Sequence, residues 1–332
     1  MYSVEICAGG GGQALGIEQA GFEHLALVEI DNAACSTLKA NRPTWNIIEG
    51  DLAEFSGMNY KGINLLAGGV PCPPFSKAGR QLGENDERNL FPEAIRLVDE
   101  IRPQAVMLEN VRGLLDAVFD EYRTRVIGDL EKLGYHAEWR LLNASDYGVP
   151  QLRPRVFFVA VKNDISEYFT WPKPIERNPL TVGQVLYDLM SANGWTGINR
   201  WSLRANDIAP TIVGGSKKHG GPDLGPTRAK KAWASLGVDG RGIADSAPNS
   251  DFVGMPRLTC RMVARLQSFP DEWSFVGKKT PVYRQIGNAL PPPLAKSVGE
   301  QISQCINIAA KNRLRGGIGI GYPNRGRKKG IS

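Results

Sequence analysis

The chain has 332 residues, of which 42% are apolar, and contains no apolar run long enough to span a bilayer, which excludes an integral membrane protein. Its five cysteines are scattered and lack metal-ligand spacing, so they indicate a reducing cytoplasm and no structural metal. The net charge of +6 is uneven: residues 1–170 hold 16 basic and 24 acidic side chains, whereas 311–332 hold 7 basic and none acidic. A basic back half predicts contact with a polyanion.

The first 165 residues predict strands that alternate with helices. The opening MYSVEICAGG is typical of a strand rather than a leader, so we expect a cytoplasmic protein. Expected strands cover 2–6, 24–29, 63–69 and 104–109, and expected helices cover 13–20, 31–41, 91–101 and about 113–133. Segments 136–143 and 155–161 predict a closing hairpin. This order predicts an α/β fold with a doubly wound, mostly parallel sheet that binds ligands at the carboxyl ends of its strands.

The remainder of the chain predicts a second, smaller domain. Residues 171–257 are basic, rich in Gly, Pro and Asn, and loop-like, which favours a recognition domain. Helical patterns return at 260–269 and 291–311, so residues 1–170 and 258–310 are expected to form one catalytic domain. The tail 311–332 is Gly- and Arg-rich and has little to bury, which predicts disorder.

The segment EICAGGGGQALG (5–16) predicts a strand, a glycine turn and a helix that together approach a ligand closely. A tight turn without a ligand is the alternative. Glu29, at the end of the second strand, is placed to hold ribose hydroxyls, and Asp51, after the third, is placed to accept from an adenine amino group. These features predict an adenosine-bearing cofactor. The spacing departs from G-x-G-x-x-G, and a nicotinamide dinucleotide and S-adenosylmethionine both stay open, although the short neutral loop suits the latter.

The segment GGVPCPPFS (68–76) places Cys72 between prolines that fix φ and remove backbone donors, which predicts a stiff loop. A rigidly held nucleophile and an incidental loop cysteine are both open. In MLENVRG, Glu109 and Asn110 are expected just past a buried strand, where a partly desolvated carboxyl can donate a proton or simply cap a helix. Arg153 and Arg155 in QLRPR share one strand face, where they suit a phosphate or carbonyl, or form a plain sheet-edge pair.

Taken in order, these segments resemble the motifs of the DNA (cytosine-5)-methyltransferase family. They continue with RLTCRMVARLQSFPD (257–271) and YRQIGNALPPPLAKSVG (283–299), so the resemblance covers nearly the whole chain. The family fold is a doubly wound sheet with a small recognition domain before the penultimate motif. The resemblance implies that a Cys72 thiolate adds to cytosine C6, that Glu109 protonates or hydrogen-bonds the ring, and that Arg153 and Arg155 hold its carbonyl and adjoining phosphate. The target base must leave the DNA stack.

The resemblance also implies the binding residues. Around S-adenosylmethionine it places Ala8, Gly9, Gly10, Gly11, Gly12, Glu29, Ile30, Asp51, Leu52, Asn288 and Ala289. Contacts to double-stranded DNA are expected from Ser76, Gln151 and Thr211, and from the basic stretch 216–231 through Lys217, Lys218 and Arg228. No metal is expected, and a monomer that modifies DNA beside a cognate restriction endonuclease is the biological role implied.

Four residues depart from the family pattern. Glu5 stands in place of Asp and Cys7 in place of Phe, which bears on cofactor affinity, and Val70 and Pro73 replace Pro and Gln, which bears on the loop around Cys72. Four alternatives are weighed: an amino-group DNA methyltransferase, a non-enzymatic DNA-binding relative, a nicotinamide oxidoreductase and an RNA-directed relative. Cys72 is a poor acceptor for an amine, and the oxidoreductase leaves Cys72 and Glu109 unused. The loop-rich segment favours duplex DNA over RNA.

Overall fold

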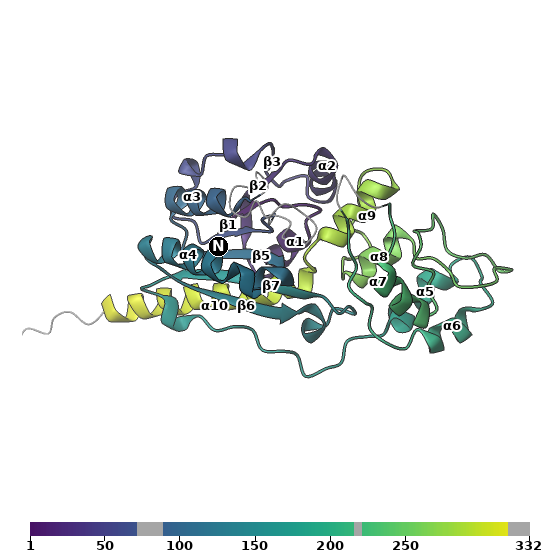
Figure 1. Ribbon diagram of the computed structural model, residues 1–332. Helices are drawn as coiled ribbons and strands as arrows, with labels where there is room; N and C mark the ends of the chain where they lie inside the picture. Colours follow the sequence, from purple (N-terminus) through teal and green to yellow (C-terminus); the bar gives the residue numbers. More distant parts are fainter. Residues whose placement is uncertain (72–88, 216–220, 318–332) are drawn as a thin grey trace, which may run out of the picture.

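A computed structural model describes residues 1–71, 89–215 and 221–317, with side chains as far as residue 314. Its centre is a seven-stranded sheet with the order β3-β2-β1-β4-β5-β7-β6 (Figure 1). The strands are β1 (Tyr2–Ile6), β2 (Glu23–Glu29), β3 (Ile47–Glu49), β4 (Leu65–Gly68), β5 (Ala105–Val111), β6 (Tyr135–Asn143) and β7 (Pro154–Lys162). Strands β3 to β5 pair in parallel, and β7 runs antiparallel to both of its neighbours. The mostly parallel sheet and its closing hairpin are confirmed.

Helices cover both faces of the sheet because its central strands are apolar on both sides. In β4, Leu66 packs into the cluster formed with α3 (Phe91–Ile101) and α4 (Asp120–Lys132). Its neighbours Leu65 and Ala67 point to the opposite face, against α1 (Gly12–Gln19) and α10 (Pro292–Gly317). Side chains alternate along a strand, so a strand buried on both faces is a continuous apolar run. This arrangement confirms the doubly wound fold.

Several element boundaries differ from the expected ones. Strand β5 continues to Val111, which pairs with Arg155 of β7, so Glu109 and Asn110 lie inside the strand and not past it. The helix expected from 113 begins at Asp120, after two 3₁₀ turns that are separated by Asp116 in an extended conformation. Helix α10 runs to Gly317, so residues 311–317 of the expected tail are helical. The rest of that tail lies outside the described residues.

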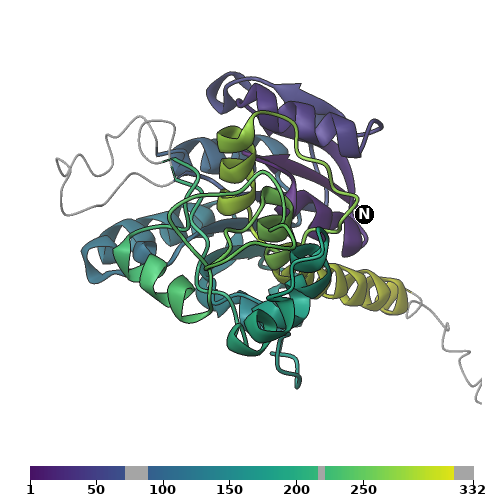
Figure 2. The same cartoon turned by 90° about the vertical axis from the view of Figure 1, so that its right-hand side faces the viewer.

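A second lobe follows the sheet, with α5 (Val182–Ser191), α6 (Ile198–Arg204) and α7 (Thr227–Ser235) set among loops. It lies at the right of Figure 1, beside α8 (Cys260–Leu266) and α9 (Lys279–Asn288), and Figure 2 shows it from its own side, in front of the sheet. Its buried tryptophans, Trp201 and Trp233, belong to a cluster that also holds Leu38 of α2 (Asn32–Asn41). The lobe therefore shares a core with the cofactor-side helices, and the domain boundaries given above stay a prediction.

Helix α2 illustrates how local sequence positions the site. Asp31 caps it as expected, because its carboxylate accepts hydrogen bonds from the Ala33 and Ala34 amides at 3.0 and 3.2 Å. The cap fixes the start of α2 at Asn32, two residues beyond Ile30, so that β2 ends at Glu29 close to the helix. Within the described part of the chain, no helix is both long and apolar enough to cross a membrane.

Candidate active site

A cavity of about 660 Å³ lies between the carboxyl ends of the strands and the end of α9. All predicted cofactor residues except Gly11 line it: Ala8, Gly9, Gly10, Gly12, Glu29, Ile30, Asp51, Leu52, Asn288 and Ala289. Gly11 instead faces the interior, where an added Cβ would lie 2.7 Å from both Leu38 and Trp273. Its φ of +88° at the start of α1 and this close packing account for the glycine, and its contact with the cofactor stays a prediction.

The glycine turn is tied to the second strand through Glu29. One carboxylate oxygen of Glu29 accepts the Gly9 amide hydrogen at 2.7 Å, and the other accepts that of Asp31 at 2.8 Å. Glu29 is thus held by two backbone donors at the cavity wall, with lone pairs left on both oxygens. A fixed carboxylate of this kind suits ribose hydroxyls, and the binding of ribose by Glu29 stays a prediction.

Two further polar side chains line the cavity without partners. The carboxyl oxygens of Glu5 and both amide atoms of Gln13 are buried and have no hydrogen-bond partner among the described residues. Burial raises the pKa of Glu5 well above its ordinary value, and the nearby Ala14 amide only partly offsets this. The unpaired oxygens of Glu5 and Gln13 are acceptors that suit the ammonium of S-adenosylmethionine, and the unpaired Gln13 nitrogen is a donor that suits its carboxylate. The residues present therefore fit that cofactor. Sequence reasoning missed Gln13, whose only signal was a polar residue on an otherwise buried helix face.

Cys7 lines the same cavity but has the wrong electrostatics for a nucleophile. Burial, together with the acidic neighbours Glu29, Glu5 and Asp51, raises the pKa of its thiol strongly. The thiol therefore stays protonated and serves as a small apolar surface where the family has a larger ring.

The far wall of the cavity depends on residues that follow the second lobe. The indole N–H of Trp273 donates to the Gly10 carbonyl at 3.1 Å, while Arg42 lies over the Trp273 ring at 5.3 Å from its centroid. The Asn288 amide nitrogen lies 3.4 Å from the carbonyl oxygen of Gly215, next to the second lobe. Trp273 is a further residue that motif reasoning missed, because it is distant from the glycine turn in the sequence and only the fold brings the two together.

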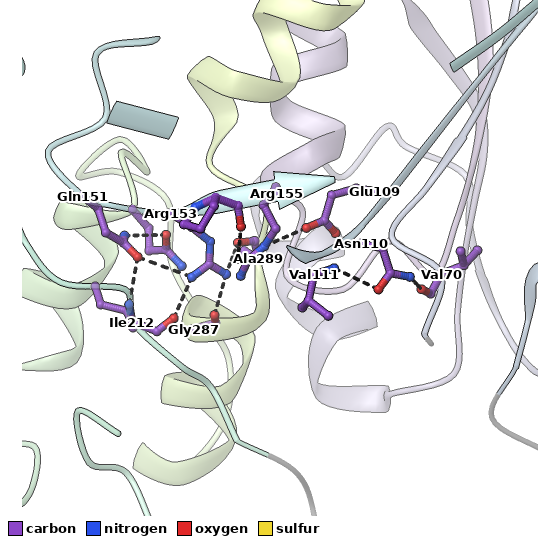
Figure 3. Close-up of polar contacts among 12 residues, drawn as sticks. Val70, Glu109, Asn110, Val111, Gln151, Arg153, Arg155, Ile212, Gly287 and Ala289 are labelled. Atoms are coloured by element: carbon purple, nitrogen blue, oxygen red, sulfur yellow. Dashed lines mark hydrogen bonds and ion pairs between the residues drawn. The ribbon is translucent and has the colours of Figure 1, made fainter. Parts of the chain in front are cut away.

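Glu109, near the carboxyl end of β5, and Arg155 form a buried ion pair beside this cavity (Figure 3). Arg155 Nε lies 2.8 Å from a Glu109 carboxylate oxygen, and each side chain is 11% exposed. Burial raises the pKa of Glu109, against the opposing influence of Arg155 and Arg153. Glu109 also lines the cavity, and a Cβ on Gly69 would lie 3.5 Å from its second oxygen. A carboxyl with a raised pKa beside a cofactor cavity is suited to general acid chemistry.

Asn110 connects Glu109 to the start of the loop that carries Cys72. Its amide nitrogen donates to the Val70 carbonyl at 2.9 Å, and its oxygen accepts the Val111 amide hydrogen at 2.8 Å (Figure 3). Val70 is 2% exposed, so the chain is anchored two residues before Cys72. Cys72 itself lies outside the described residues, and so do Ser76, Lys217 and Lys218.

Arg153 occupies a different environment from Arg155. It is fully buried, and its guanidinium donates to the carbonyls of Ile212, Gly287 and Ala289 at 2.6, 2.7 and 2.8 Å (Figure 3). The expectation that Arg153 holds the cytosine carbonyl or a phosphate is therefore corrected, because three backbone acceptors already use its terminal nitrogens. Arg153 instead joins β7 to the second lobe and to the end of α9.

Gln151 belongs to the same buried network. Its side chain is fully buried, donates to Gln267 at 2.8 Å and accepts the Ile212 amide hydrogen at 2.9 Å. This environment corrects the expectation that it contacts DNA. The Thr211 hydroxyl donates to the Leu152 carbonyl, whereas Arg228 is exposed on α7. Among the described residues, no group of three or more His, Cys, Asp or Glu side chains could hold a metal ion.

Comparison with known proteins agrees with this geometry. Residues 1–304 match the model of the family described as C-5 cytosine-specific DNA methylase. The chain is 57% identical to the type II methyltransferase M.NgoMIV of Neisseria gonorrhoeae over 307 residues, which cover 92% of this chain and 97% of that protein. It is also 57% identical to the type II methyltransferase M.NaeI of Lentzea aerocolonigenes, over 94% of this chain and 77% of that protein.

The fold has solved counterparts as well. The structure of a Spodoptera frugiperda DNMT2 variant superposes with a TM-score of 0.64 at 18% identity, covering 91% of this chain and 99% of that one. At that identity the likeness concerns the fold alone. The sequence relatives and the family model carry the assignment: this chain belongs to the C-5 cytosine-specific DNA methylase family.

Proposed function

We propose that the protein transfers the methyl group of S-adenosylmethionine to C5 of a cytosine flipped out of a short duplex DNA sequence, through a covalent bond between Cys72 and C6. The membership of the chain in a family of cytosine-specific DNA methylases makes it an enzyme of this class. The observation that carries the finer proposal is the buried Glu109–Arg155 pair at the cavity edge, with Asn110 anchoring the chain two residues before Cys72.

Each of these residues has a chemical role in the proposal. Bound S-adenosylmethionine, held by Glu29, Asp51, Asn288 and the glycine turn, supplies the electrophilic methyl group. The Cys72 thiolate forms a bond to cytosine C6, which places electron density on C5. Glu109 donates a proton or hydrogen bond at N3 and so lowers the cost of that addition. Once C5 carries the methyl group, loss of its proton to a base allows the Cys72–C6 bond to break, which returns the thiolate and restores the aromatic ring.

The burial of the Glu109–Arg155 pair supports these roles. The raised pKa of Glu109 favours the protonated form that donates to the base, and Arg155 keeps terminal donors for the cytosine carbonyl. An ordinary thiol with a pKa of about 8.5 is only a few per cent ionised at pH 7, so Cys72 needs local activation. Extruding the base costs about a few kcal/mol, and it is required because C5 and C6 are covered by neighbouring bases in a duplex.

The biological setting is proposed from the relatives. Their names as type II methyltransferases suggest that this enzyme protects DNA against a cognate restriction endonuclease, acting as a monomer in the cytoplasm where that DNA lies. Finding no endonuclease gene beside its own would contradict the pairing. An RNA substrate is the alternative outcome, and the experiment below separates the two.

The test is covalent trapping on duplex DNA that contains 5-fluorocytosine in random sequence, with S-adenosylmethionine present. Fluorine at C5 cannot leave as a proton, so wild type should accumulate a protein–DNA adduct that resists denaturant. C72S should form none, whereas C260S, which changes another free cysteine, should trap like wild type. Methyl transfer to ordinary DNA without any adduct would exclude the Cys72 mechanism, and methylation of RNA alone would exclude the DNA substrate.

A further inference from the structure

Two arginines of the second lobe share one carboxylate. Arg241 Nε lies 2.8 Å from Asp239 Oδ1 and its Nη2 lies 3.2 Å from Oδ2, while Arg257 Nε lies 3.0 Å from Oδ2. The Asp239 side chain is 11% exposed, whereas those of Arg241 and Arg257 are 76% and 47% exposed. The hydrogen bond from Arg241 is the main reason why the pKa of Asp239 lies far below its ordinary value. Both guanidinium groups therefore favour the charged form of the carboxylate, which in turn orients them.

The contacts leave the recognition edges of both arginines open. Arg257 donates only through Nε, so the hydrogens on Nη1 and Nη2 have no partner among the described residues. Arg241 uses Nε and one Nη2 hydrogen, so its Nη1–Nη2 edge is open as well. Two parallel N–H donors of this kind match a bidentate acceptor, such as O6 and N7 of guanine in the major groove.

This arginine pair is connected to the cofactor cavity through short contacts. The Tyr283 hydroxyl of α9, the helix whose end forms the cavity wall, donates to the Asp223 carbonyl. The next residue, Leu224, donates its amide hydrogen to the Gly240 carbonyl at 3.0 Å, and Gly240 lies between Asp239 and Arg241. The arginine pair therefore has a defined position relative to the site where the target base must enter.

The surroundings of the pair carry positive charge. A Cβ on Gly240 would lie 3.3 Å from Lys230 of α7, and the same helix exposes Arg228 and Lys231. Exposed lysines and arginines of this kind suit phosphate contacts, which set position but not sequence. Both arginines of the pair are exposed, so they too can reach a bound duplex.

We propose that Arg241 and Arg257, held side by side by Asp239, recognise two neighbouring guanines of the methylation target in the major groove. Both guanidinium groups contact the same carboxylate and so lie close together, and stacked base pairs are about 3.4 Å apart, which makes adjacent guanines the targets that the two arginines could reach together. The inference rests on the proposed function, since it assigns sequence recognition for that same reaction. Asp239 is then a positioning residue that acts through the two arginines.

The test is the sequence preference of methylation on a random duplex pool, read by sequencing the methylated sites. Wild type should select a target that contains adjacent guanines. R241Q and R257Q should each lose about 10- to 100-fold of the discrimination at one of those guanine positions. D239N should relax both positions, because the arginines lose the carboxylate that orients them, while it should retain affinity for random DNA, because both positive charges remain. R313Q, which breaks the exposed Arg313–Asp164 pair, removes a positive charge elsewhere, as R241Q and R257Q do in the second lobe, and should leave the preference unchanged.

A second measurement uses duplexes of the selected target with 7-deazaguanine at each guanine in turn. Wild type should bind these more weakly at both positions, and each arginine variant should be insensitive at its own position. Unchanged sequence preference in R241Q and R257Q would overturn the inference, whether they bind all DNA more weakly with a shallower salt dependence or are simply less stable. If wild type methylates no DNA in the pool, the proposed function itself fails; a normal wild-type pattern with unaltered variants refutes only the arginine assignment.

Discussion

Replacement of Arg153 by Met tests whether this arginine acts in the fold or in the reaction. The side chain is fully buried, and its terminal nitrogens satisfy the carbonyls of Ile212, Gly287 and Ala289 at 2.6 to 2.8 Å. Methionine fills a similar volume without any donor. R153M therefore leaves three buried acceptors unpaired at the junction of β7, the second lobe and the end of α9.

The size of the effect follows from those contacts. Each buried carbonyl that loses its partner costs about 1–3 kcal/mol, and local relaxation recovers part of the sum. Removal of a charge from a buried network costs about 3–5 kcal/mol in comparable cases, which we take as the expected loss of unfolding free energy. At about 2 °C per kcal/mol for a chain of this length, Tm should fall by roughly 6–10 °C.

The assay is thermal unfolding together with kcat for methyl transfer at 20 °C and saturating cofactor. R153M should lose thermal stability but keep kcat within about tenfold of wild type, because Arg153 does not reach the cavity. R155M is the matched comparison: it breaks the buried ion pair with Glu109 and should also lose thermal stability, but unlike R153M it should lose kcat by about a hundredfold or more, in the range of general acid and electrostatic contributions. An R153M protein with wild-type Tm and a kcat lowered as far as that of R155M would refute this reasoning.

Three further predictions follow from the cavity walls. The pKa of Glu5 is raised in the folded protein, so the stability that its protonated carboxyl contributes is present below the pKa of the unfolded chain, near 4.5, and is lost as pH rises through the pKa of the folded protein. E5Q should therefore gain Tm relative to wild type between about pH 5 and pH 8. A Tm difference that stays constant over this range would contradict the argument. N110A should lower kcat by about tenfold through the lost bond to Val70, with cofactor Kd by calorimetry within twofold of wild type; an equal change in Kd would place Asn110 in the cofactor site instead. W273F removes the indole donor to the glycine turn and should raise cofactor Kd by about 5- to 10-fold. W45F changes the neighbouring ring, which makes no hydrogen bond to that turn, and should not; equal effects would indicate general loosening.

Sequence reasoning succeeded where a residue's position depends on the sheet alone. Glu29 and Asp51 follow parallel strands, and the carboxyl ends of such strands meet at one edge, so their approach to a common cavity follows from the strand order. Glu109 reaches the same cavity for the same reason, although β5 extends past it. The order of the strands alone is enough to place these three residues at the cavity.

It failed where orientation depends on segments distant in the sequence. The partners of Arg153 are 59 to 136 residues away along the chain, so no local pattern distinguishes its buried position from that of Arg155. Gln151 likewise meets Gln267 from α8's end, and Gly11 meets Trp273. The alternation rule placed both arginines on one strand face, but Arg153 precedes β7 and turns into the junction instead.

The buried junction around Arg153 has a consequence for chimeric enzymes. Exchanging recognition segments between relatives is a direct route to new target specificities, and the sequence suggests cutting near 171 and 257. The structure shows that the backbone at Ile212, in the middle of that interval, completes the hydrogen bonding of Arg153 and Gln151 from the catalytic side. A graft should therefore keep the host's own residues at 209–215 and exchange only the flanking loops, since a foreign backbone there could remove the hydrogen bonds to Arg153 and Gln151 and destabilise the chimera.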